Sequence, residues 1–301
     1  MSGFFVGIFF ANFVLVMIKI RIGGVPEHFN LPIHLANENG DFKKAGIEIE
    51  WTDFGGGTGE MTKALRNNEV DICILLTEGI ILDIINGNPS KIISEYVITP
   101  LCWGIHTSIN NPINEYSQIY NKQYAISRNG SGSHLMAQID ANGQGLDLKE
   151  SQFKIIKNLD GALSSLEKLD TDIFYWEKFT TKPYVDNGLL KRIGEFPTPW
   201  PSFMVAASDK ILAEHPIIID KFIDVIQERC QNFMLSDKEV IPQVAERYKL
   251  KLEDAENWFH RTEWAINGWV SDKMLQSVIF NLKLANILEQ DKETPELIWK
   301  R

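Results

Sequence analysis

A regular pattern of hydrophobic and polar positions begins close to Met17. Isoleucines alternate with charged residues over 18–23, and apolar residues alternate with glutamates over 47–51. This is the period of a half-buried β-strand. The continuous apolar run over 70–75 is typical of a strand that is buried on both faces. Segments with helical spacing separate these strands, so the order predicts an α/β protein whose mostly parallel sheet is covered by helices.

A fourth strand is predicted over 92–98, and a second unit of the same kind follows Pro100. Its expected elements are strands at 103–106, 123–127, 153–156, 172–175 and 189–193, and a short helix at 176–181. Three prolines, at 197, 199 and 201, predict an interruption of regular structure. A strand over 203–207 is then expected to return to the first sheet, and the rest of the chain is predicted to be helical.

Composition and charge exclude some classes of function. The 301 residues are 44% hydrophobic and 23% charged, as in a globular protein large enough for two modest domains. A formal net charge of −10 argues against a nucleic-acid partner, because that contact needs clustered positive charge. The isolated cysteines Cys73, Cys102 and Cys230 match neither a disulfide framework nor a zinc-ligand spacing. We expect no metal site and no cofactor.

The N-terminal segment leaves the location of the protein open. Residues 4–18 are almost all apolar, but the run is shorter than the roughly 20 residues that a membrane span needs. No basic residue precedes it and no small-residue cleavage pattern follows, as a secretory signal would require. One interpretation is that Met17 is the natural start of a cytoplasmic protein. The other is a degenerate export or anchor segment of a protein that acts outside the cytoplasm.

Several stretches of the sequence together resemble one protein superfamily. The first stretch is a strand followed by a proline-bearing loop and a helix. Three further stretches follow it in this order: NGDFKKAGIEIEW, GGGTGEMTKALRNNEVDICIL and SDKILAEHPIIIDKFIDVI. In this order they resemble the type II periplasmic binding proteins, over nearly the whole chain from Met17 to Leu288. The similarity is to the substrate-binding proteins of nitrate, sulfonate and taurine importers and to their relatives in thiamine-pyrimidine biosynthesis. Within the superfamily the chain resembles an uncharacterised branch with bacterial and fungal members.

The resemblance implies an α/β fold of two lobes, each a mixed sheet flanked by helices, with the ligand cleft at the hinge. Lobe 1 would comprise residues 18–100 and 203–301, lobe 2 would comprise 101–202, and residues 1–17 would be an apolar extension. Closure around the strands near Ile98 and Met204 would trap the ligand. The partners it implies are a small-molecule ligand and, for a transport protein, an ABC-type permease, and the expected state is a monomer.

Ligands of open α/β sheets bind beyond the carboxyl ends of strands, where loops from neighbouring strands meet. In the two-lobed fold both lobes offer such loops to one cleft. The candidate ligand-binding residues are therefore the following: Glu27, His28, Phe29, Asn30, Gly57, Thr58, Thr77, Glu78, Ser131, Gly132, Ser133, Tyr175, Trp176, Glu177, Trp200 and Phe203.

The chemistry of these residues supports two classes of ligand. Glu27, Glu78 and Glu177 would repel a simple anion such as nitrate and would suit a small heteroaromatic, pyrimidine-like or amine-bearing molecule. For any single one of them, a solvated position at a helix start is the alternative. The segment 131–133 opens a predicted helix, whose free N–H groups favour a carboxylate, sulfonate or phosphate, although an ordinary helix cap fits equally well.

Other candidates also have a structural alternative. Trp176, Trp200 and Phe203 could clamp a flat ring or simply pack between the lobes. His28 could hydrogen-bond a ligand through either ring nitrogen or lie exposed in its loop. The loop at Gly57 could bind an anion or form a tight turn, and no P-loop lysine follows it.

The preferred function is a non-enzymatic, solute-binding protein of ABC-transporter type. The related pyrimidine synthases need an active-site lysine, a reactive histidine and a cysteine-rich iron motif, and no cysteine cluster occurs here. No nucleophile motif such as GxSxG occurs either. A cytosolic ligand-binding or sensor protein, a sulfonate or anion binder and a pyrimidine-metabolism enzyme remain as alternatives.

Overall fold

The computed structural model describes residues 17–300. The apolar segment over 4–16, on which the prediction of location rests, lies outside these residues. Among the helices of residues 17–300, none combines the length and the apolar character that crossing a membrane requires.

Within the described residues the strands form one mixed sheet in the order β2-β1-β3-β8-β4-β7-β5-β6. The strands are β1 (Ile18–Gly24), β2 (Ile47–Asp53), β3 (Ile72–Leu76), β4 (Ser90–Ser108), β5 (Tyr124–Ile126), β6 (Phe153–Ile155), β7 (Ile173–Glu177) and β8 (Leu190–Ser208). Strand β1 is parallel to β2 and β3, and β5 is parallel to β6 and β7. The central pairs, β3 with β8, β8 with β4 and β4 with β7, are antiparallel.

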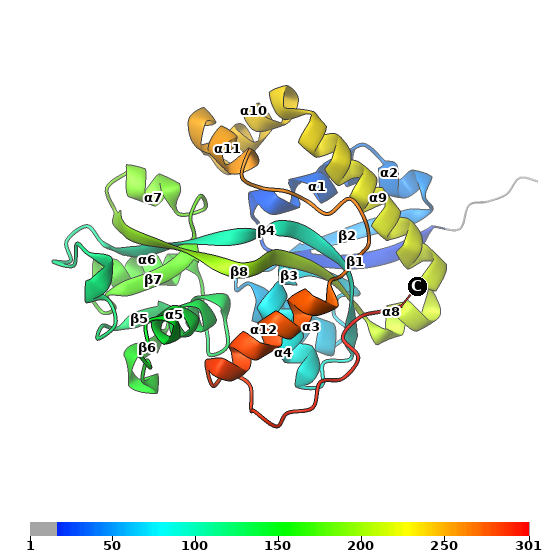
Figure 1. Cartoon of the computed structure of the whole chain (residues 1–301). Coiled ribbons are helices and arrows are strands. Elements are labelled where there is room, and N and C mark those ends of the chain that lie inside the picture. Colours follow the sequence, from blue (N-terminus) through cyan, green and yellow to red (C-terminus); the bar gives the residue numbers. More distant parts are fainter. Residues whose placement is uncertain (1–16, 301) are drawn as a thin grey trace, which may run out of the picture.

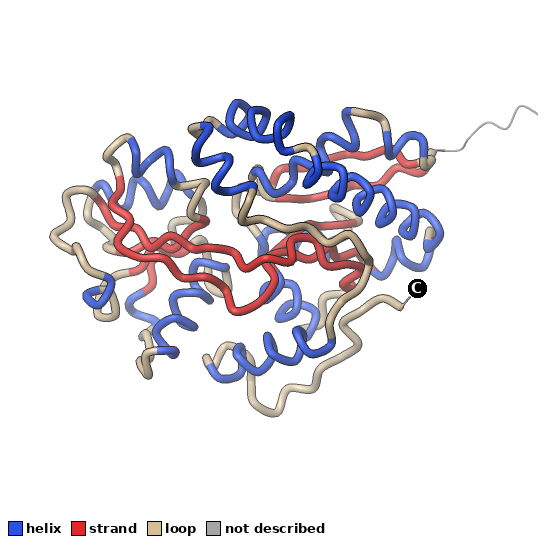
Figure 2. The backbone as a smooth tube through the Cα atoms, turned by 45° about the horizontal axis from the view of Figure 1, so that its top comes forward, coloured by secondary structure: helices blue, strands red, loops and turns tan. Residues whose placement is uncertain are grey.

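Two long strands join the two parts of the sheet. We call the part that contains β1, β2 and β3 the β1 side, and the part that contains β5, β6 and β7 the β7 side. Strands β4 and β8 pair along most of their length and run through both sides, as Figures 1 and 2 show. Their pairing is shifted near the middle, where Pro100 lies opposite Pro201.

These long strands correct the prediction of four separate ones. The predicted strands 92–98 and 103–106 are both part of β4, and 189–193 and 203–207 are both part of β8. Prolines lack the N–H group that a ladder needs, but at register shifts they are tolerated without ending the strand. The predicted helix 176–181 is also displaced, because β7 extends to Glu177 and the helix begins at Lys182.

Helices cover both faces of the sheet. They are η1 (His28–Asn30), α1 (Leu31–Glu38), α2 (Asp41–Lys44), α3 (Thr58–Arg66), α4 (Thr77–Ile85), η2 (Tyr116–Gln118), α5 (Gly132–Gly143), η3 (Glu150–Gln152), α6 (Leu159–Glu167), α7 (Lys182–Asp186), α8 (Asp209–Glu214), α9 (Pro216–Leu235), α10 (Asp237–Tyr248), α11 (Leu252–Phe259) and α12 (Asp272–Leu284). On the β1 side, α1, α2 and α9 lie above the sheet in Figure 1, and α3, α4 and α12 lie below it. Burial of the apolar helix faces against the sheet supplies most of the stabilisation.

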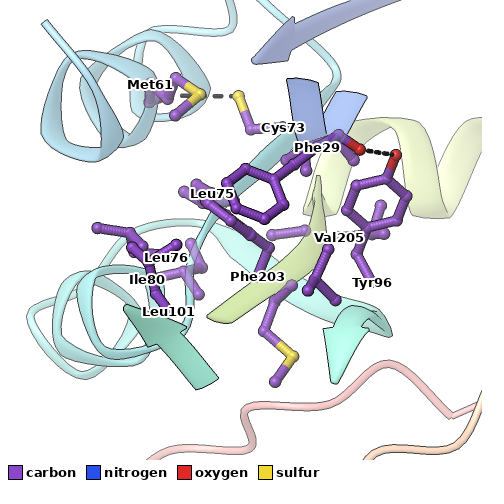
Figure 3. Packing of buried hydrophobic residues seen from close by; sticks show 14 of the residues in the cluster. Phe29, Met61, Cys73, Leu75, Leu76, Ile80, Tyr96, Leu101, Phe203 and Val205 are labelled. Carbon is purple, nitrogen blue, oxygen red and sulfur yellow. Dashed lines mark hydrogen bonds between the residues drawn. The ribbon is translucent and has the colours of Figure 1, made fainter. Parts of the chain in front are cut away.

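The hydrophobic core reaches the point where the two sides meet. Figure 3 shows Phe203 beside Phe29, and their ring centroids are 5.0 Å apart. The hydroxyl group of Tyr96 donates a 2.8 Å hydrogen bond to the carbonyl oxygen of Phe29, which fixes the loop after β1 to β4. Leu76 and Leu101 complete this part of the core. The loop after β1 therefore has a rigid base.

Candidate functional site

A pocket lies where the loops of the β1 side meet those of the β7 side. It encloses about 450 Å³, including the part that opens to solvent. Its lining residues are Val25, Glu27, Gly56, Gly57, Thr58, Leu76, Leu101, Trp103, Ser127, Arg128, Ser131, Gly132, Ser133, Trp176, Glu177 and Phe203. Both sides contribute polar and apolar groups, so a molecule held here would touch both parts of the sheet.

The structure brings nine of the sequence-predicted residues into this lining. They are Glu27, Gly57, Thr58, Ser131, Gly132, Ser133, Trp176, Glu177 and Phe203. All except Phe203 lie in loops at the carboxyl ends of strands, in the first turns of the helices that follow, or in the last residues of β7. This is the arrangement on which the prediction was based.

Three of the other predicted residues directly follow Glu27 in the chain and pack beneath the loop that carries it. His28 is 2% exposed, and its Nε2 atom lies 3.5 Å from Glu177 Oε2. Phe29 belongs to the core, and Asn30 donates a 2.8 Å hydrogen bond to the carbonyl oxygen of Val25. They hold the loop that carries Glu27, and none of them lines the pocket.

The remaining four predicted residues make contacts within the protein. Trp200 Nε1 donates a 2.9 Å hydrogen bond to Glu78 Oε2, so these two buried side chains bind each other. The Thr77 hydroxyl group donates to the carbonyl oxygen of Pro201, and the Tyr175 hydroxyl group donates to a carboxylate oxygen of Asp140. Of the three glutamates in the charge argument, only Glu27 and Glu177 therefore reach the pocket.

Seven lining residues are not among the candidates predicted from the sequence: Val25, Gly56, Leu76, Leu101, Trp103, Ser127 and Arg128. Ser127 and Arg128 directly follow β5, so the loop rule could have included them. Trp103 lies inside β4, and no sequence signal marked it. A side chain on Gly132 would collide with the Trp103 ring, 2.6 Å from its Cη2 atom, so glycine lets this indole lie against the start of α5.

Glu177 is an ionised carboxylate with several partners. Burial opposes its ionisation, but His28 and the backbone N–H groups of Phe179 and Thr180 outweigh burial and lower its pKa. These two N–H groups donate hydrogen bonds of 2.9 Å and 2.6 Å to Oε2, and the Thr180 hydroxyl group donates another of 2.9 Å. The bonds converge on Oε2, so Oε1 is the oxygen left for a ligand.

Glu27 has the opposite electrostatic environment. Burial, reinforced by the charge of Glu177, raises its pKa to about 8. Thr180 and Trp176 oppose this shift without cancelling it. At neutral pH the pocket therefore contains one carboxylate and one neutral carboxylic acid.

Arg128 connects the β7 side to the β1 side. Its Nη1 atom donates a hydrogen bond to the carbonyl oxygen of Gly56, in the loop that precedes α3. Burial lowers the pKa of Arg128, although it stays a cation at neutral pH, and the charge of Glu60 opposes the shift. Within the described residues no carboxylate lies within 4.0 Å of its guanidinium group. Arg128 is thus the positive charge of the pocket, close to the first turn of α5.

Ion pairs outside the pocket also join the two sides. Helix α7 lies on the β7 side, and α11 follows the helices that cover the β1 side (Figure 1). Lys182 of α7 pairs with Asp254 of α11 at 3.3 Å, and Lys251 pairs with Asp186 of α7 at 2.7 Å. The structure therefore shows the two sides in contact.

The donor atoms of the described residues do not suggest a metal centre. No group of three or more His, Cys, Asp or Glu side chains within residues 17–300 is placed to hold a metal ion. The pocket offers hydrogen-bonding groups, charges and aromatic surface for a small molecule.

Comparison with known proteins shows the fold. The profile of a family described as Ca3427-like PBP matches residues 103–196. A Candida albicans protein, described as defining a new family with the generic periplasmic binding protein fold, is 29% identical. It superimposes with a TM-score of 0.86 over 95% of this chain and 99% of its own. No curated protein matches the sequence.

More distant solved structures share the architecture. The alkanesulfonate-binding protein SsuA of Xanthomonas axonopodis, bound to MOPS, has a TM-score of 0.79 at 12% identity, covering 94% of this chain and 98% of its own. The nitrate-binding protein NrtA of Synechocystis has a TM-score of 0.68 at 15% identity, covering 92% and 84%. The predicted fold class, a periplasmic binding protein fold with a mixed sheet and flanking helices, is confirmed.

Proposed function

We propose that this chain, a member of the type II periplasmic binding protein superfamily that resembles its Ca3427-like family, traps a small organic solute between the two sides of its sheet. The observation that carries the proposal is the pocket of about 450 Å³ that both sides line. SsuA and NrtA, which share the fold, are described as binding proteins, and the proposal contains no catalytic step.

The lining favours a flat, nitrogen-bearing ligand. Trp103 and Trp176 offer aromatic surface, with Leu76 and Leu101 as further apolar wall. Stacking of a ring on such side chains adds about 0.5–1.5 kcal/mol per pair beyond the burial of area. The ionised Glu177 would accept hydrogen bonds from an amino group or a ring N–H, and it would repel a simple anion such as nitrate. A heteroaromatic, pyrimidine-like or amine-bearing molecule fits these groups.

Closure of two lobes is the mechanism that we propose for trapping. Lobe 1 would comprise residues 18–100 and 203–301, and lobe 2 residues 101–202, with movement where Pro100 lies opposite Pro201. Ligand drives closure only if it binds the closed form more tightly. The bond from Arg128 to Gly56 supports this, because it forms only when the two sides are close.

The proposed role is the solute-binding component of an ABC-type importer. The alternative is a cytosolic binding or sensor protein of the same fold. Determining the N-terminus of the native protein separates the two. A chain that starts at Met17 supports the cytosolic role, and a processed or anchored chain outside the cytoplasm supports the importer.

The test of ligand binding is a thermal-shift panel on the purified protein. It contains pyrimidines, thiamine precursors, aromatic amines, sulfonates including MOPS, aromatic carboxylates and nitrate. A ligand at 100 times its Kd adds about 2.7 kcal/mol, which raises the Tm of a chain of this size by several degrees. We expect ring-bearing amines to give the largest shift. No shift with any compound of the panel would contradict the proposal.

A second candidate, an anion binder, rests on one observation. Arg128 has no carboxylate within 4.0 Å among residues 17–300 and lies beside the first turn of α5. A cation and a helix N-terminus together favour a sulfonate or carboxylate. In the panel, shifts with sulfonates alone would select this candidate over the nitrogen-bearing ligand.

Gly59→Ala is expected to separate folding stability from ligand affinity. A Cβ atom at this position would lie 2.6 Å from Arg128 Nη2, so it displaces the guanidinium group and breaks the bond to Gly56. Alanine also favours the helix by about 0.5–1 kcal/mol over glycine. We expect an unchanged or higher Tm and an affinity for the best panel ligand that is weaker by about tenfold or more.

The matched control is Gly143→Ala, which makes the same change in helix α5 with open space around the new methyl group. It should leave ligand affinity unchanged. Equal affinities of the two variants, measured by isothermal titration calorimetry, would contradict a role for the Arg128–Gly56 contact in closure.

A further inference from the structure

The two carboxyl groups of the pocket come from opposite sides of the sheet. Glu27 lies in the loop after β1, and Glu177 is the last residue of β7. Glu27 is 8% exposed and Glu177 is 4% exposed, yet both line the same pocket. The arrangement is thus a pair of buried acids assembled where the two sides meet.

The partners of the two acids differ. Glu177 Oε2 accepts three hydrogen bonds from Phe179 and Thr180 and lies 3.5 Å from the His28 ring. The side chains of Thr180 and Trp176 are the hydrogen-bond donors beside the Glu27 carboxyl group, and they do not offset the cost of burying its charge. A buried polar group without a partner costs free energy, whereas the neutral form of an acid costs much less to bury than its anion. Of the two acids, the protein therefore stabilises a negative charge on Glu177.

We propose, on the premise that the pocket binds a small solute, that its ligand is a cation with an ammonium or amidinium group that replaces a proton on Glu27. The exchange balances in atoms and charge: Glu27 gives its carboxyl proton to solvent, and the bound cation takes its place between the two carboxylates. No other reactant is needed. The ligand supplies a positive charge and further N–H donors next to the Glu27 carboxylate, beyond the Thr180 and Trp176 side chains that already lie beside it.

The groups that face Glu27 agree with this exchange. The charge of Glu177, from β7, disfavours a second carboxylate, and the His28 ring from η1 pairs with Glu177 instead. Tyr248 of α10 also faces Glu27, and burial together with neighbouring acids keeps its phenol neutral. Arg128 lines the same pocket but donates to Gly56. Arg128 therefore does not pair with the two carboxyl groups, and in the proposal the ligand supplies the positive charge between them.

The test uses three probes of one shape and three charges: benzamidine, a cation, benzamide, which is neutral, and benzoate, an anion. Titration calorimetry of the whole protein in two buffers of different ionisation enthalpy measures the protons released on binding. We expect benzamidine to bind at least tenfold more tightly than benzamide and to release close to one proton near pH 7. Its affinity should rise by up to about tenfold per pH unit from about pH 6 and level off above the Glu27 pKa of about 8.

Glu27→Gln should abolish the proton release and make the affinity for benzamidine independent of pH in this range. Glu78→Gln is the matched control. Glu78 is a second buried acid whose pKa burial raises to about 7, but it binds Trp200 and does not line the pocket. The control variant should bind benzamidine and release a proton as the unmodified protein does.

The outcomes separate this inference from the proposed function. The inference is wrong if benzamide or benzoate binds as tightly as benzamidine. It is also wrong if benzamidine binds without releasing a proton. In both cases the proposal that the pocket binds a small solute still stands. Failure of benzamidine at millimolar concentration, together with a neutral or anionic hit in the thermal-shift panel, overturns it in the same way. Failure of all three probes and of the whole panel overturns the proposed function as well.

Discussion

Glu177→Gln is expected to weaken the binding of a cationic ligand by about 10- to 100-fold. Hydrogen bonds to a charged group contribute about 1.5–3 kcal/mol, and the amide removes the charge while keeping the size of the side chain. The variant should still fold, because the amide oxygen can accept the N–H groups of Phe179 and Thr180 that now bind Oε2. Calorimetry with benzamidine, alongside a Tm measurement, checks both statements.

Glu195→Gln is the control for that substitution. Glu195 is a carboxylate on the same side of the sheet, but it is 41% exposed, pairs with Lys178 at 2.7 Å and lies outside the pocket lining. Its loss should change the affinity less than twofold, because exposed ion pairs contribute little. If both variants bind benzamidine as the unmodified protein does, Glu177 has no role in ligand recognition.

Trp258→Ala is expected to give the largest loss of folding stability, about 3–5 kcal/mol. Trp258 lies on α11 and is 1% exposed. Its ring centroid is 4.4 Å from that of His28, 5.6 Å from that of Phe29 and 5.6 Å from that of Trp264. Alanine would leave a cavity behind the loop that carries Glu27. Denaturant unfolding measures the loss, and the binding of benzamidine should weaken as well, because His28 loses its packing.

Trp269→Ala makes the same chemical change at a side chain that is 67% exposed. It should change the free energy of unfolding by no more than about 0.5 kcal/mol. A loss below about 1 kcal/mol for Trp258→Ala would show that α11 does not pack against the loop after β1 in solution.

The local sequence determined most of the secondary structure and the general place of the site. Alternation over 18–23 and 47–51 corresponds to β1 and β2, and the apolar run over 70–75 overlaps β3. The spacing of hydrophobic residues in a strand or helix reflects which of its faces is buried. This spacing can therefore be recognised within a single stretch of sequence. The rule that ligands bind beyond the carboxyl ends of strands then selected the loops that carry Glu27, Thr58, Ser131 and Glu177.

The tertiary structure decided which side chains face the pocket. Glu27 follows β1 and Glu78 follows β3, but Glu78 accepts a hydrogen bond from Trp200, which lies 122 positions away, and does not line the pocket. Arg128 reaches Gly56, which lies 72 positions away. Each of these contacts joins two segments that are far apart in the sequence. The local pattern of hydrophobic and polar residues in one segment does not indicate which distant segment it will contact.

The same reason explains the two long strands. The prolines at 197, 199 and 201 are strong local signals for an interruption, and only pairing with β4, shifted in register, lets β8 continue past them. The sequence by itself determined most of the strands and helices and the loops that can carry a site, because these depend on local patterns. The pairing of β4 with β8 decided how the two sides meet, and with it which carboxyl groups share one pocket.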